Sequence, residues 1–518
     1  MANTVFACTA IYVGKDASND GTILVARSND CADVFAARLK IYPRVENEPG
    51  RTLPVDISGT VTAQLPETTY KYSGTPMMDS TLTFSGTGRD DAVCINENGV
   101  AMTMSITSFS NKAAMEADPW VETGISEFTA DQLVISQSGT AREAVDTICH
   151  LIDEYGSSET NIAIITDQDE AWYVEMYTGH QYAAVKLPDD KVCVFGNEFN
   201  LEYLSDYEES ITSPELETLA VENGFAVYGD NGELNLWATY SGPEVVEEYS
   251  HMRTWIGHKT LAPDSYGDYD HDEMYPLTFT AQEKVSLLQV MELIRNRYEG
   301  TEYCPDTTGR IDMRVIGTDT ALSVHIIQLD PAMPAEAAGT TWVSLGPAVY
   351  GVFVPMNILC TEPSASYAAS QPAEMAKQFE ADVYPYFAFK ELNTLCMMDY
   401  RTYGTPVRAY WHEAETQMID GMDAMRRHIS EELAADPEKA QEEMTQYCAG
   451  LQEKAFADAK ILLNEVRWYT SKNSNTMKLG KNPETGEYLT SERVLDPIEV
   501  TLDGSFYGEK QDHSQDPD

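Results

Sequence analysis

Positive charge is scarce in this chain. Lys and Arg number 34 against 84 Asp and Glu in 518 residues, which gives a formal net charge of −50. Nucleic acids and anionic membrane surfaces would be repelled by such a chain, so neither is expected as a partner. Hydrophobic residues still make up 43% of the sequence, which excludes a disordered acidic chain and favours a folded protein.

Long apolar runs and paired cysteines are also missing. No run of about 18 apolar residues occurs, so no transmembrane helix is expected. Residues 1–7 contain no Lys or Arg and are too short for the apolar core of a secretory signal. The nine cysteines are scattered without a C-x-x-C pair, which argues against a disulfide framework and a cysteine zinc site. The chain is therefore expected to be cytoplasmic.

Motifs for nucleotides and metals are absent as well. The sequence has no Walker loop, no G-x-G-x-x-G after a strand and no G-x-S-x-G elbow. The acidic cluster between residues 264 and 273 lacks the glycine and the final ligand of an EF-hand, so a solvated loop is favoured. No metal and no cofactor are expected.

Strand-like and helix-like segments follow one another in blocks. β-branched and aromatic runs dominate up to about residue 110, a capped helix is predicted over 140–155, and strands then return. Long 3.6-residue periodicities mark the last third. This order favours an α+β fold. The main predicted strands are 6–13, 22–27, 34–42, 81–84, 92–95, 100–106, 161–166, 171–177, 182–187, 192–195, 311–316, 321–328 and 341–345, and the late helices are 373–400, 406–433 and 436–469.

The most informative segment is the hairpin over residues 6–30. If the two strands pair about the centre of the turn-rich loop 14–21, Cys8 faces Arg27 and the two side chains share one face. A guanidinium beside a thiol favours the thiolate and lowers its pKa. Asp30 lies just past the expected strand end and can fold back to the same place. A bulge would break this register, and a buried strand cysteine is the alternative interpretation of Cys8.

The position of Cys8 suggests a second activator. If residues 1–7 were removed, Cys8 would carry a free α-amine, whose ordinary pKa is about 8, and this amine can act as the base for its own thiol. No distant histidine would then be needed. Asp30 can hydrogen-bond the resulting α-ammonium and hold it in place.

Several segments resemble those of one enzyme family. The sequence around Cys8, Arg27 and Asp30 resembles the N-terminus of the cysteine dipeptidases, which belong to the N-terminal-nucleophile (Ntn) hydrolases and include the bacterial dipeptidase A/D type and the related secernins. The resemblance runs in order over about residues 8–470. Its further segments are Asn96-Glu97-Asn98-Gly99, Thr140-Ala141-Arg142-Glu143, Ala171-Trp172-Tyr173-Val174-Glu175, Phe195-Gly196-Asn197-Glu198, Met252-Arg253-Thr254-Trp255 and Tyr298-Glu299-Gly300-Thr301.

The resemblance implies an αββα sandwich of two antiparallel sheets, followed here by a long C-terminal helical region. Cys8 would be the nucleophile, exposed by self-cleavage of a leader over 1–7. Arg27 and Asp30 match the residues that flank it, Asn197 matches an oxyanion donor, and Arg253 matches the remaining active-site arginine. Gly196 departs from the alanine that often precedes this asparagine. The implied division is a leader over 1–7, a catalytic core over 8–370, a helical extension over 371–470 and a C-terminal segment over 471–518.

The function implied is hydrolysis of dipeptides through an acyl-thioester. Glu175 is a further candidate for binding the substrate ammonium, with a surface strand residue as the alternative. Small dipeptides are the expected partners, and a homo-oligomer is compatible with the resemblance. Two other functions stay open: an N-acyl amide hydrolase like the penicillin V and bile-salt acylases, which would share the nucleophile, and a non-catalytic secernin-like scaffold.

Overall fold

The computed structural model describes most of the chain. The described residues are 8–31, 34, 36–76, 91–104, 106–310, 313–372, 375, 377–473, 480–481, 485, 488–489 and 496–502. The leader over 1–7, the predicted strand over 81–84 and the polar tail from residue 504 lie outside them.

The first sheet carries the hairpin that the sequence singled out. Its six strands are antiparallel to their neighbours, and every residue of its long central strand β2 is buried. β2 and its neighbour β16 are rich in Ile, Val and Leu, as expected for strands covered on both faces. In spatial order the strands are β14 (Val192–Phe195), β1 (Ala10–Val13), β2 (Ile23–Asp30), β16 (Ala321–Leu329), β17 (Gly339–Leu345) and β18 (Val354–Asn357).

The second sheet has eight strands, again antiparallel throughout. In spatial order they are β15 (Ser210–Thr212), β13 (Tyr182–Lys186), β12 (Ala171–Met176), β11 (Asn161–Thr166), β10 (Ala101–Thr103), β9 (Asp91–Asn96), β8 (Tyr72–Pro76) and β3 (Lys40–Tyr42). Three small two-stranded ladders pair β4 (Val45–Glu46) with β7 (Thr68–Thr69), β5 (Thr52–Pro54) with β6 (Thr62–Gln64), and β19 (Gly480–Lys481) with β20 (Tyr488–Leu489).

The two sheets stack face to face. Alternate residues of β1 point to opposite sides, so Ala10 and Tyr12 enter the apolar layer between the sheets while Ile11 and Val13 face outward. Within that layer the ring of Tyr173 from the second sheet meets Phe195 from the first edge-on, with ring centroids 5.2 Å apart. A single buried cluster thus joins the two inner faces.

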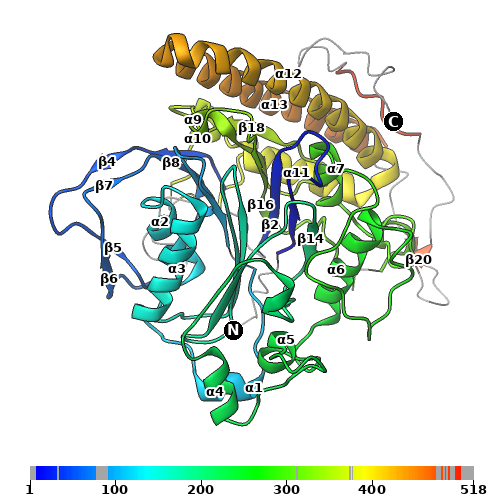
Figure 1. Ribbon diagram of the computed structural model, residues 1–518. Helices are drawn as coiled ribbons and strands as arrows, with labels where there is room; N and C mark the ends of the chain where they lie inside the picture. Colours follow the sequence, from blue (N-terminus) through cyan, green and yellow to red (C-terminus); the bar gives the residue numbers. More distant parts are fainter. Residues whose placement is uncertain are drawn as a thin grey trace.

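Helices cover both outer faces, as Figure 1 shows. α2 and α3 pack on the second sheet, and α6, α7 and the C-terminal helices pack on the first. The αββα order implied by the resemblance is confirmed. The helices are α1 (Lys112–Ala117), α2 (Glu127–Ile135), α3 (Ala141–Tyr155), α4 (Leu216–Glu222), α5 (Leu236–Tyr240), α6 (Glu248–Leu261), α7 (Leu287–Leu293), α8 (Pro305–Thr308), α9 (Ala335–Ala338), α10 (Ala365–Ala368), α11 (Pro385–Met398), α12 (Thr405–Ala435) and α13 (Pro437–Lys472), with a 3-10 turn at Leu204–Asp206 and a π-helical turn at Tyr400–Gly404.

α3 illustrates how local sequence sets an element. The Thr140 side chain accepts from the backbone N–H of Glu143 at 3.1 Å, and the helix ends at Gly156, where φ is +75°. The Glu143 carboxylate accepts from the N–H of Gly139 rather than from that of Thr140, as it would in a capping box. Ala144, Val145 and Ile148 are spaced to share one helix face, and that face is buried.

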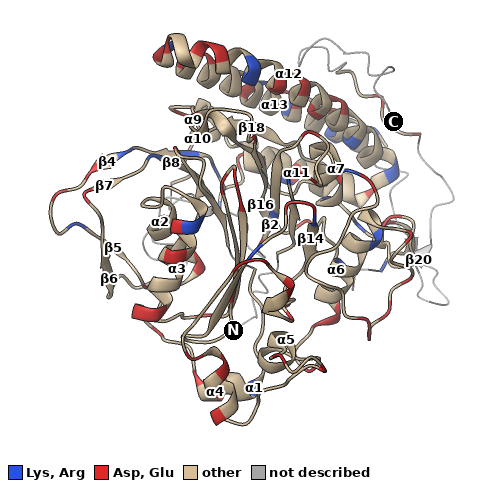
Figure 2. Cartoon of the chain, viewed as in Figure 1, with Lys and Arg blue, Asp and Glu red and all other residues tan. Residues whose placement is uncertain are grey.

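The C-terminal helices form a long antiparallel pair across the first sheet. α12 and α13 meet at Asp436, which accepts from the N–H of Lys439 at 3.2 Å and precedes a proline in the first helical position. Figure 2 shows that acidic residues collect on outer helices such as α12 and on loops, whereas the stacked strands are mostly uncharged. None of the described helices is both long and apolar enough to cross a membrane.

Several predicted elements differ from the structure. The strand expected over 6–13 begins only at Ala10, and the strand expected over 100–106 is β10 (Ala101–Thr103). The strand expected over 34–42 is reduced to β3 (Lys40–Tyr42), although the N–H of Arg38 still donates to the Pro76 carbonyl of β8 in the same register. The strand expected over 311–316 is absent from residues 313–316, and 311–312 lie outside the described residues. The helix expected over 373–400 begins only at Pro385.

Candidate active site

Cys8 and Arg27 come together, although not by the predicted register. Arg27 pairs with Ala10 across the β1–β2 ladder, and Cys8 lies two residues before β1 begins. A shift of two positions keeps side chains on the same face of a strand. The Arg27 Nη1 donor therefore still reaches the Cys8 sulfur, at 3.2 Å. The predicted contact is present, while the predicted pairing partner is wrong.

The Arg27 guanidinium is held from the opposite sheet. Its Nε donates to the Thr103 hydroxyl of β10 at 2.9 Å, and the same oxygen lies 2.9 Å from Nε2 of His325. His325 pairs with Arg27 across the β16–β2 ladder. Burial, together with the charge of Arg27, lowers the pKa of His325 well below its ordinary value, so this imidazole is neutral. Thr103 thus links the two sheets beside the nucleophile.

The thiol of Cys8 is fully buried, with an exposed fraction of 0%. Burial raises its pKa, and Arg27, the next largest influence, only partly opposes this effect. The backbone N–H of Asp30 also points at the sulfur and favours the thiolate. The expectation of a lowered thiol pKa is therefore wrong for the chain that still carries residues 1–7, because desolvation outweighs the guanidinium.

Asn197 and Arg253 hold the main chain of Cys8. Asn197 follows β14, and its Oδ1 accepts from the Cys8 backbone N–H at 3.0 Å and from Arg253 Nη2 at 2.8 Å. Arg253, buried on α6, donates from Nη1 to the Cys8 carbonyl at 2.7 Å and to the Thr9 hydroxyl at 3.0 Å. Both backbone groups of Cys8 are therefore fixed by residues that lie far away in the sequence.

The position of Gly196, just after β14, leaves no room for a side chain. A Cβ at this position would lie 2.7 Å from the Ser250 carbonyl oxygen and 3.1 Å from Arg253 Nη2. The loop can approach α6 closely because this side chain is missing. The departure from alanine noted in the sequence thus coincides with tight packing around Arg253.

Asp30 is the last residue of β2, and its carboxylate is buried. Its Oδ2 lies 3.4 Å from Arg314 Nη2, and its Oδ1 has no hydrogen-bond partner within the described residues. Burial raises the pKa of Asp30 to about 6, although Arg314 and Arg253 both act in the opposite direction. The site therefore holds an under-satisfied carboxylate close to the nucleophile.

Glu175 is buried rather than on the surface. It lies on β12, and its carboxylate accepts from the Tyr173 hydroxyl at 2.6 Å and from the backbone N–H groups of Asn200 and Leu201 at 2.7 and 3.2 Å. Burial raises its pKa despite these donors. The surface-residue alternative is wrong, and the observed contacts position the loop that follows Asn197.

Three residues of the site were not identified from the sequence: Thr103, His325 and Arg314. Each lies in a separate segment that reaches Cys8 only when the sheets stack or the chain folds over. His325, two strands away from Cys8, had no spacing signal at all. Among the described residues, no group of three His, Cys, Asp or Glu side chains is arranged to hold a metal ion.

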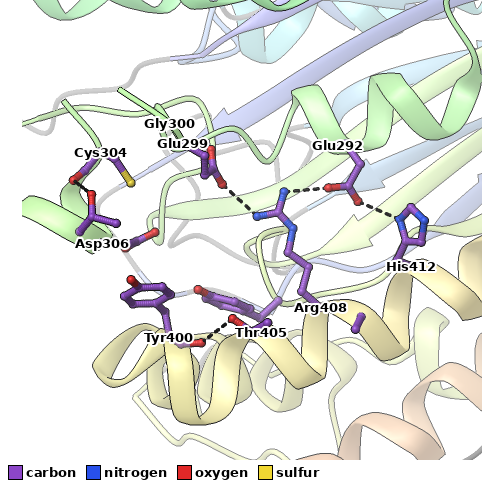
Figure 3. Close-up of a pocket in the computed structure, with 12 residues that line it drawn as sticks. Glu292, Glu299, Gly300, Cys304, Asp306, Tyr400, Thr405, Arg408 and His412 are labelled. Atoms are coloured by element: carbon purple, nitrogen blue, oxygen red, sulfur yellow. Dashed lines mark hydrogen bonds and ion pairs between the residues drawn. The ribbon is translucent and has the colours of Figure 1, made fainter. Parts of the chain in front are cut away.

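A cavity of about 420 Å³ lies apart from this cluster, between α7, the loop over 299–307 and α12. Figure 3 shows that its charged groups pair with one another: Arg408 donates to Glu292 at 2.8 Å and to Glu299 at 3.0 Å, and His412 lies 3.4 Å from Glu292. Because the charges of Arg408, Glu292, Glu299 and His412 are paired with one another, none of these four side chains offers an unpaired charge to a ligand.

Comparison with known proteins gives consistent matches. The sequence profile of peptidase family C69 matches residues 7–413. A protein named probable dipeptidase B from Streptococcus pyogenes serotype M1 is 30% identical over 500 residues, which cover 93% of this chain and 96% of that protein. Another of the same name, from Lactococcus lactis subsp. lactis (strain IL1403), is 30% identical over 370 residues, covering 70% of this chain and 76% of that protein.

Solved structures give weaker matches. The penicillin V acylase from Agrobacterium tumefaciens aligns with a TM-score of 0.32 and 14% identity, over 68% of this chain and 86% of that chain. The conjugated bile acid hydrolase from Clostridium perfringens, as its C2A mutant, aligns with a TM-score of 0.29 and 10% identity, over 70% of this chain and 95% of that chain.

Proposed function

Since the chain belongs to peptidase family C69, we propose that it hydrolyses dipeptides with Cys8 as an N-terminal nucleophile. One observation carries the choice of residue: Arg27 contacts the Cys8 sulfur while Asn197 and Arg253 bind its backbone N–H and carbonyl. A cysteine with only a packing role would not need polar partners on its sulfur, nitrogen and oxygen at once. The relatives named probable dipeptidase B support the dipeptide as substrate.

Removal of residues 1–7 comes first. The Cys8 sulfur attacks the carbonyl carbon of residue 7, the bond from that carbon to the Cys8 nitrogen breaks, and the nitrogen takes the thiol proton. Water then hydrolyses the thioester, which releases the leader as a free acid and leaves Cys8 with a thiol and an α-amine. The contact from the Cys8 nitrogen to Asn197 Oδ1, 3.0 Å long before cleavage, would hold this amine in place.

Dipeptide hydrolysis repeats this chemistry on a substrate. The α-amine takes the thiol proton, and the thiolate, favoured by Arg27, attacks the scissile carbonyl carbon. The carbon–nitrogen bond breaks as the α-ammonium returns the proton to the leaving amine, which gives an acyl-thioester. Water, deprotonated by the same amine, hydrolyses the thioester and regenerates the enzyme.

Asn197 is the proposed donor to the oxyanion. One hydrogen of its Nδ2 group is used by the Thr107 carbonyl at 2.8 Å, and an amide NH₂ has a second hydrogen to give. A donor aimed at the developing oxyanion contributes about 3 kcal/mol to transition-state stabilisation. Arg253 fixes the carbonyl side of this asparagine, and so orients the amide.

The nine cysteines are free and buried, which supports the proposal that the enzyme works in a reducing compartment such as the cytoplasm. Asp30 is proposed to hydrogen-bond the α-ammonium through Oδ1, the oxygen left without a partner among the described residues. Oε1 of Glu175 accepts from the loop after Asn197, so the proposed part of this carboxylate is to position that loop.

The test combines intact mass with hydrolysis of Xaa-Yaa dipeptides. Wild-type protein should lack residues 1–7 and split dipeptides, whereas Cys8→Ala should keep the leader and lose at least 10⁴-fold in kcat/KM, as expected on loss of a nucleophile. Cys193→Ala, which removes another buried thiol from β14, is the matched control and should resemble wild type.

Dipeptide hydrolysis by Cys8→Ala would refute the assignment of the nucleophile. Hydrolysis of penicillin V or a conjugated bile salt in place of dipeptides would favour the N-acyl amide alternative. A retained leader with no hydrolysis would favour the scaffold alternative.

A further inference from the structure

Arg314 is the third arginine at the Cys8 site and differs from the other two in exposure. The side chain of Arg314 is 23% exposed, whereas Arg27 and Arg253 have no exposed surface. Arg27 donates to the Cys8 sulfur and to the Thr103 hydroxyl. Arg253 donates to the Cys8 carbonyl and to Asn197 Oδ1. Of these three guanidinium groups, only that of Arg314 can be reached from solvent.

Arg314 also keeps donors to spare. Among the described residues its one hydrogen bond joins Nη2 to Asp30 Oδ2 at 3.4 Å, and its buried Nε has no hydrogen-bond partner there. Arg297 shows what a structural arginine looks like here: it binds both oxygens of Asp306 at 2.7 and 2.8 Å and the Gly317 carbonyl at 2.8 Å. A guanidinium has five N–H donors, so most of those of Arg314 remain open.

The backbone of Arg314 is nevertheless firmly anchored. The Tyr298 hydroxyl donates to the Arg314 carbonyl at 2.8 Å, and Tyr298 has a φ of +58°. A tyrosine in this left-handed conformation is strained, and such strain persists mainly where the surrounding structure requires it. The ring of Tyr249 lies 5.9 Å from the Arg314 guanidinium carbon and supports it from one side. The backbone of Arg314 is thus fixed by Tyr298, while its guanidinium stays partly exposed to solvent.

We propose that Arg314 binds the α-carboxylate of the C-terminal residue of the dipeptide, and so selects substrates that end one residue after the scissile bond. This inference rests on the proposed function. Arginine binds a carboxylate through two parallel N–H donors. The Arg314 side chain is 23% exposed and makes a single long contact to Asp30 among the described residues, so its guanidinium has donors left for such a pair. In a protein with a net charge of −50, a local cation of this kind is needed to attract an anionic group.

Asp30 connects this arginine to the nucleophile. Its backbone N–H points at the Cys8 sulfur, and its carboxylate contacts Arg314. In a dipeptide the terminal carboxylate lies about one residue length, or ~3.5 Å, from the attacked carbonyl, and each further residue adds about the same distance. Arg314 contacts the side chain of Asp30, whose backbone N–H adjoins the sulfur, and a carboxylate-binding group one residue removed from the nucleophile fits a dipeptide better than a longer peptide.

The experiment compares one dipeptide with its own C-terminal amide, using the mature enzyme. Wild type should prefer the free acid by roughly 10- to 100-fold in kcat/KM, as expected for a charge-assisted hydrogen-bonded pair. Arg314→Met should lose that preference by slowing on the acid alone, with the amide rate unchanged, and Arg314→Lys should keep part of it. Arg401→Met, which removes the same charge from an exposed side chain in the Tyr400–Gly404 turn, should behave as wild type.

The other possible results separate failure of this inference from failure of the proposed function. Equal losses on acid and amide in Arg314→Met would show that Arg314 only supports Asp30, and would overturn the inference. A wild-type enzyme that splits the amide as well as the acid would overturn it too, even if Arg314→Met fails to fold. Failure of wild type to split either substrate would instead refute the proposed function, and the inference with it.

Discussion

Two of the buried arginine–carboxylate clusters among the described residues differ in how completely their charges are paired. At the junction between α7 and α12, Arg295 binds both oxygens of Glu415 and the Ala348 carbonyl, and Glu415 also accepts from the Phe353 N–H. At the Cys8 site, Asp30 Oδ1 and Arg314 Nε have no hydrogen-bond partner within the described residues.

The carboxylates of the two clusters respond in opposite directions. Burial alone would raise the pKa of Glu292 at the junction, but Arg295 and Arg408 outweigh it and the pKa is lowered. Burial dominates at Asp30 and raises its pKa to about 6, although two arginines are close. Saturated pairs hold the fold together, whereas unsaturated ones cost stability and are kept where a ligand or a reaction can use them.

The largest effect expected on this comparison is at the junction. Glu415→Gln should lower the free energy of unfolding by about 3–5 kcal/mol, because it leaves the buried Arg295 guanidinium without its bidentate partner. Glu292 Oε1, 3.4 Å from Arg295 Nη1, still compensates part of the arginine charge and limits the loss of stability. Urea unfolding at pH 8 measures the change in the free energy of unfolding. Glu391→Gln, which breaks the half-exposed pair with Arg467, should lose less than about 1 kcal/mol. Similar losses in both variants would contradict the distinction between the clusters.

The next effect has the opposite sign. Asp30→Asn should stabilise the fold by up to about 3 kcal/mol at pH 8, because its folded pKa of about 6 exceeds the ordinary value of about 3.9 and each unit corresponds to ~1.4 kcal/mol. The folded state binds the Asp30 proton more tightly than the unfolded state does. The ionised carboxylate therefore lowers the free energy of unfolding fully above pH 6, and this penalty disappears as the pH falls towards 4. The gain in stability of Asp30→Asn over the parent should show the same pH dependence.

This measurement is best made in a Cys8→Ala background, which should keep the leader, by urea unfolding between pH 4 and pH 8. The difference between the two variants cancels the other titrating groups. In the enzyme with Cys8 intact, the same change should lower kcat/KM by about 100-fold, in line with loss of a group that positions a proton acceptor. An Asp30→Asn variant that is less stable at pH 8 would show that the carboxylate holds the fold together.

A smaller effect is expected at Thr103. Thr103→Val should destabilise the fold by about 2 kcal/mol, because Arg27 Nε loses a buried acceptor. It should also raise the pH at which iodoacetamide alkylates Cys8, since the guanidinium is no longer held against the sulfur. Thr103→Ser keeps the hydroxyl and should restore the alkylation profile. An unchanged profile in Thr103→Val would show that Arg27 is placed by the β2 ladder alone.

Elements with local signals could be predicted from the sequence. The cap at Thr140 and the glycine at 156 predicted the limits of α3, and the strands β11 (Asn161–Thr166) and β14 (Val192–Phe195) have the predicted bounds. In each case the turn residues that end the element are neighbours in the chain. Secondary structure of this kind depends little on the rest of the molecule.

Register and distant contacts could not be predicted in this way. The loop after β1 is shaped from outside the hairpin: Gly14 donates to the Lys191 carbonyl, Ala17 to that of Asp189, and Asn19 to that of Val285. These bonds lengthen the hairpin loop beyond its turn-rich residues and move the pairing by two positions. The sequence placed Cys8 near Arg27 and Asp30 because they share one hairpin, but Thr103, His325 and Arg314 reach it only through the stacked sheets and a returning loop.

The hydroxyl of Thr103 stands on one sheet and binds two residues of the other. The apolar layer around it has no preferred direction and tolerates small lateral slippage of one sheet over its neighbour. A hydrogen bond weakens steeply once its length and angle leave a narrow range. The reactivity of the Cys8 sulfur therefore depends on the lateral alignment of the two sheets. A displacement of one sheet too small to unfold the protein would break the Thr103 contacts that hold Arg27 against the sulfur, and would abolish that reactivity.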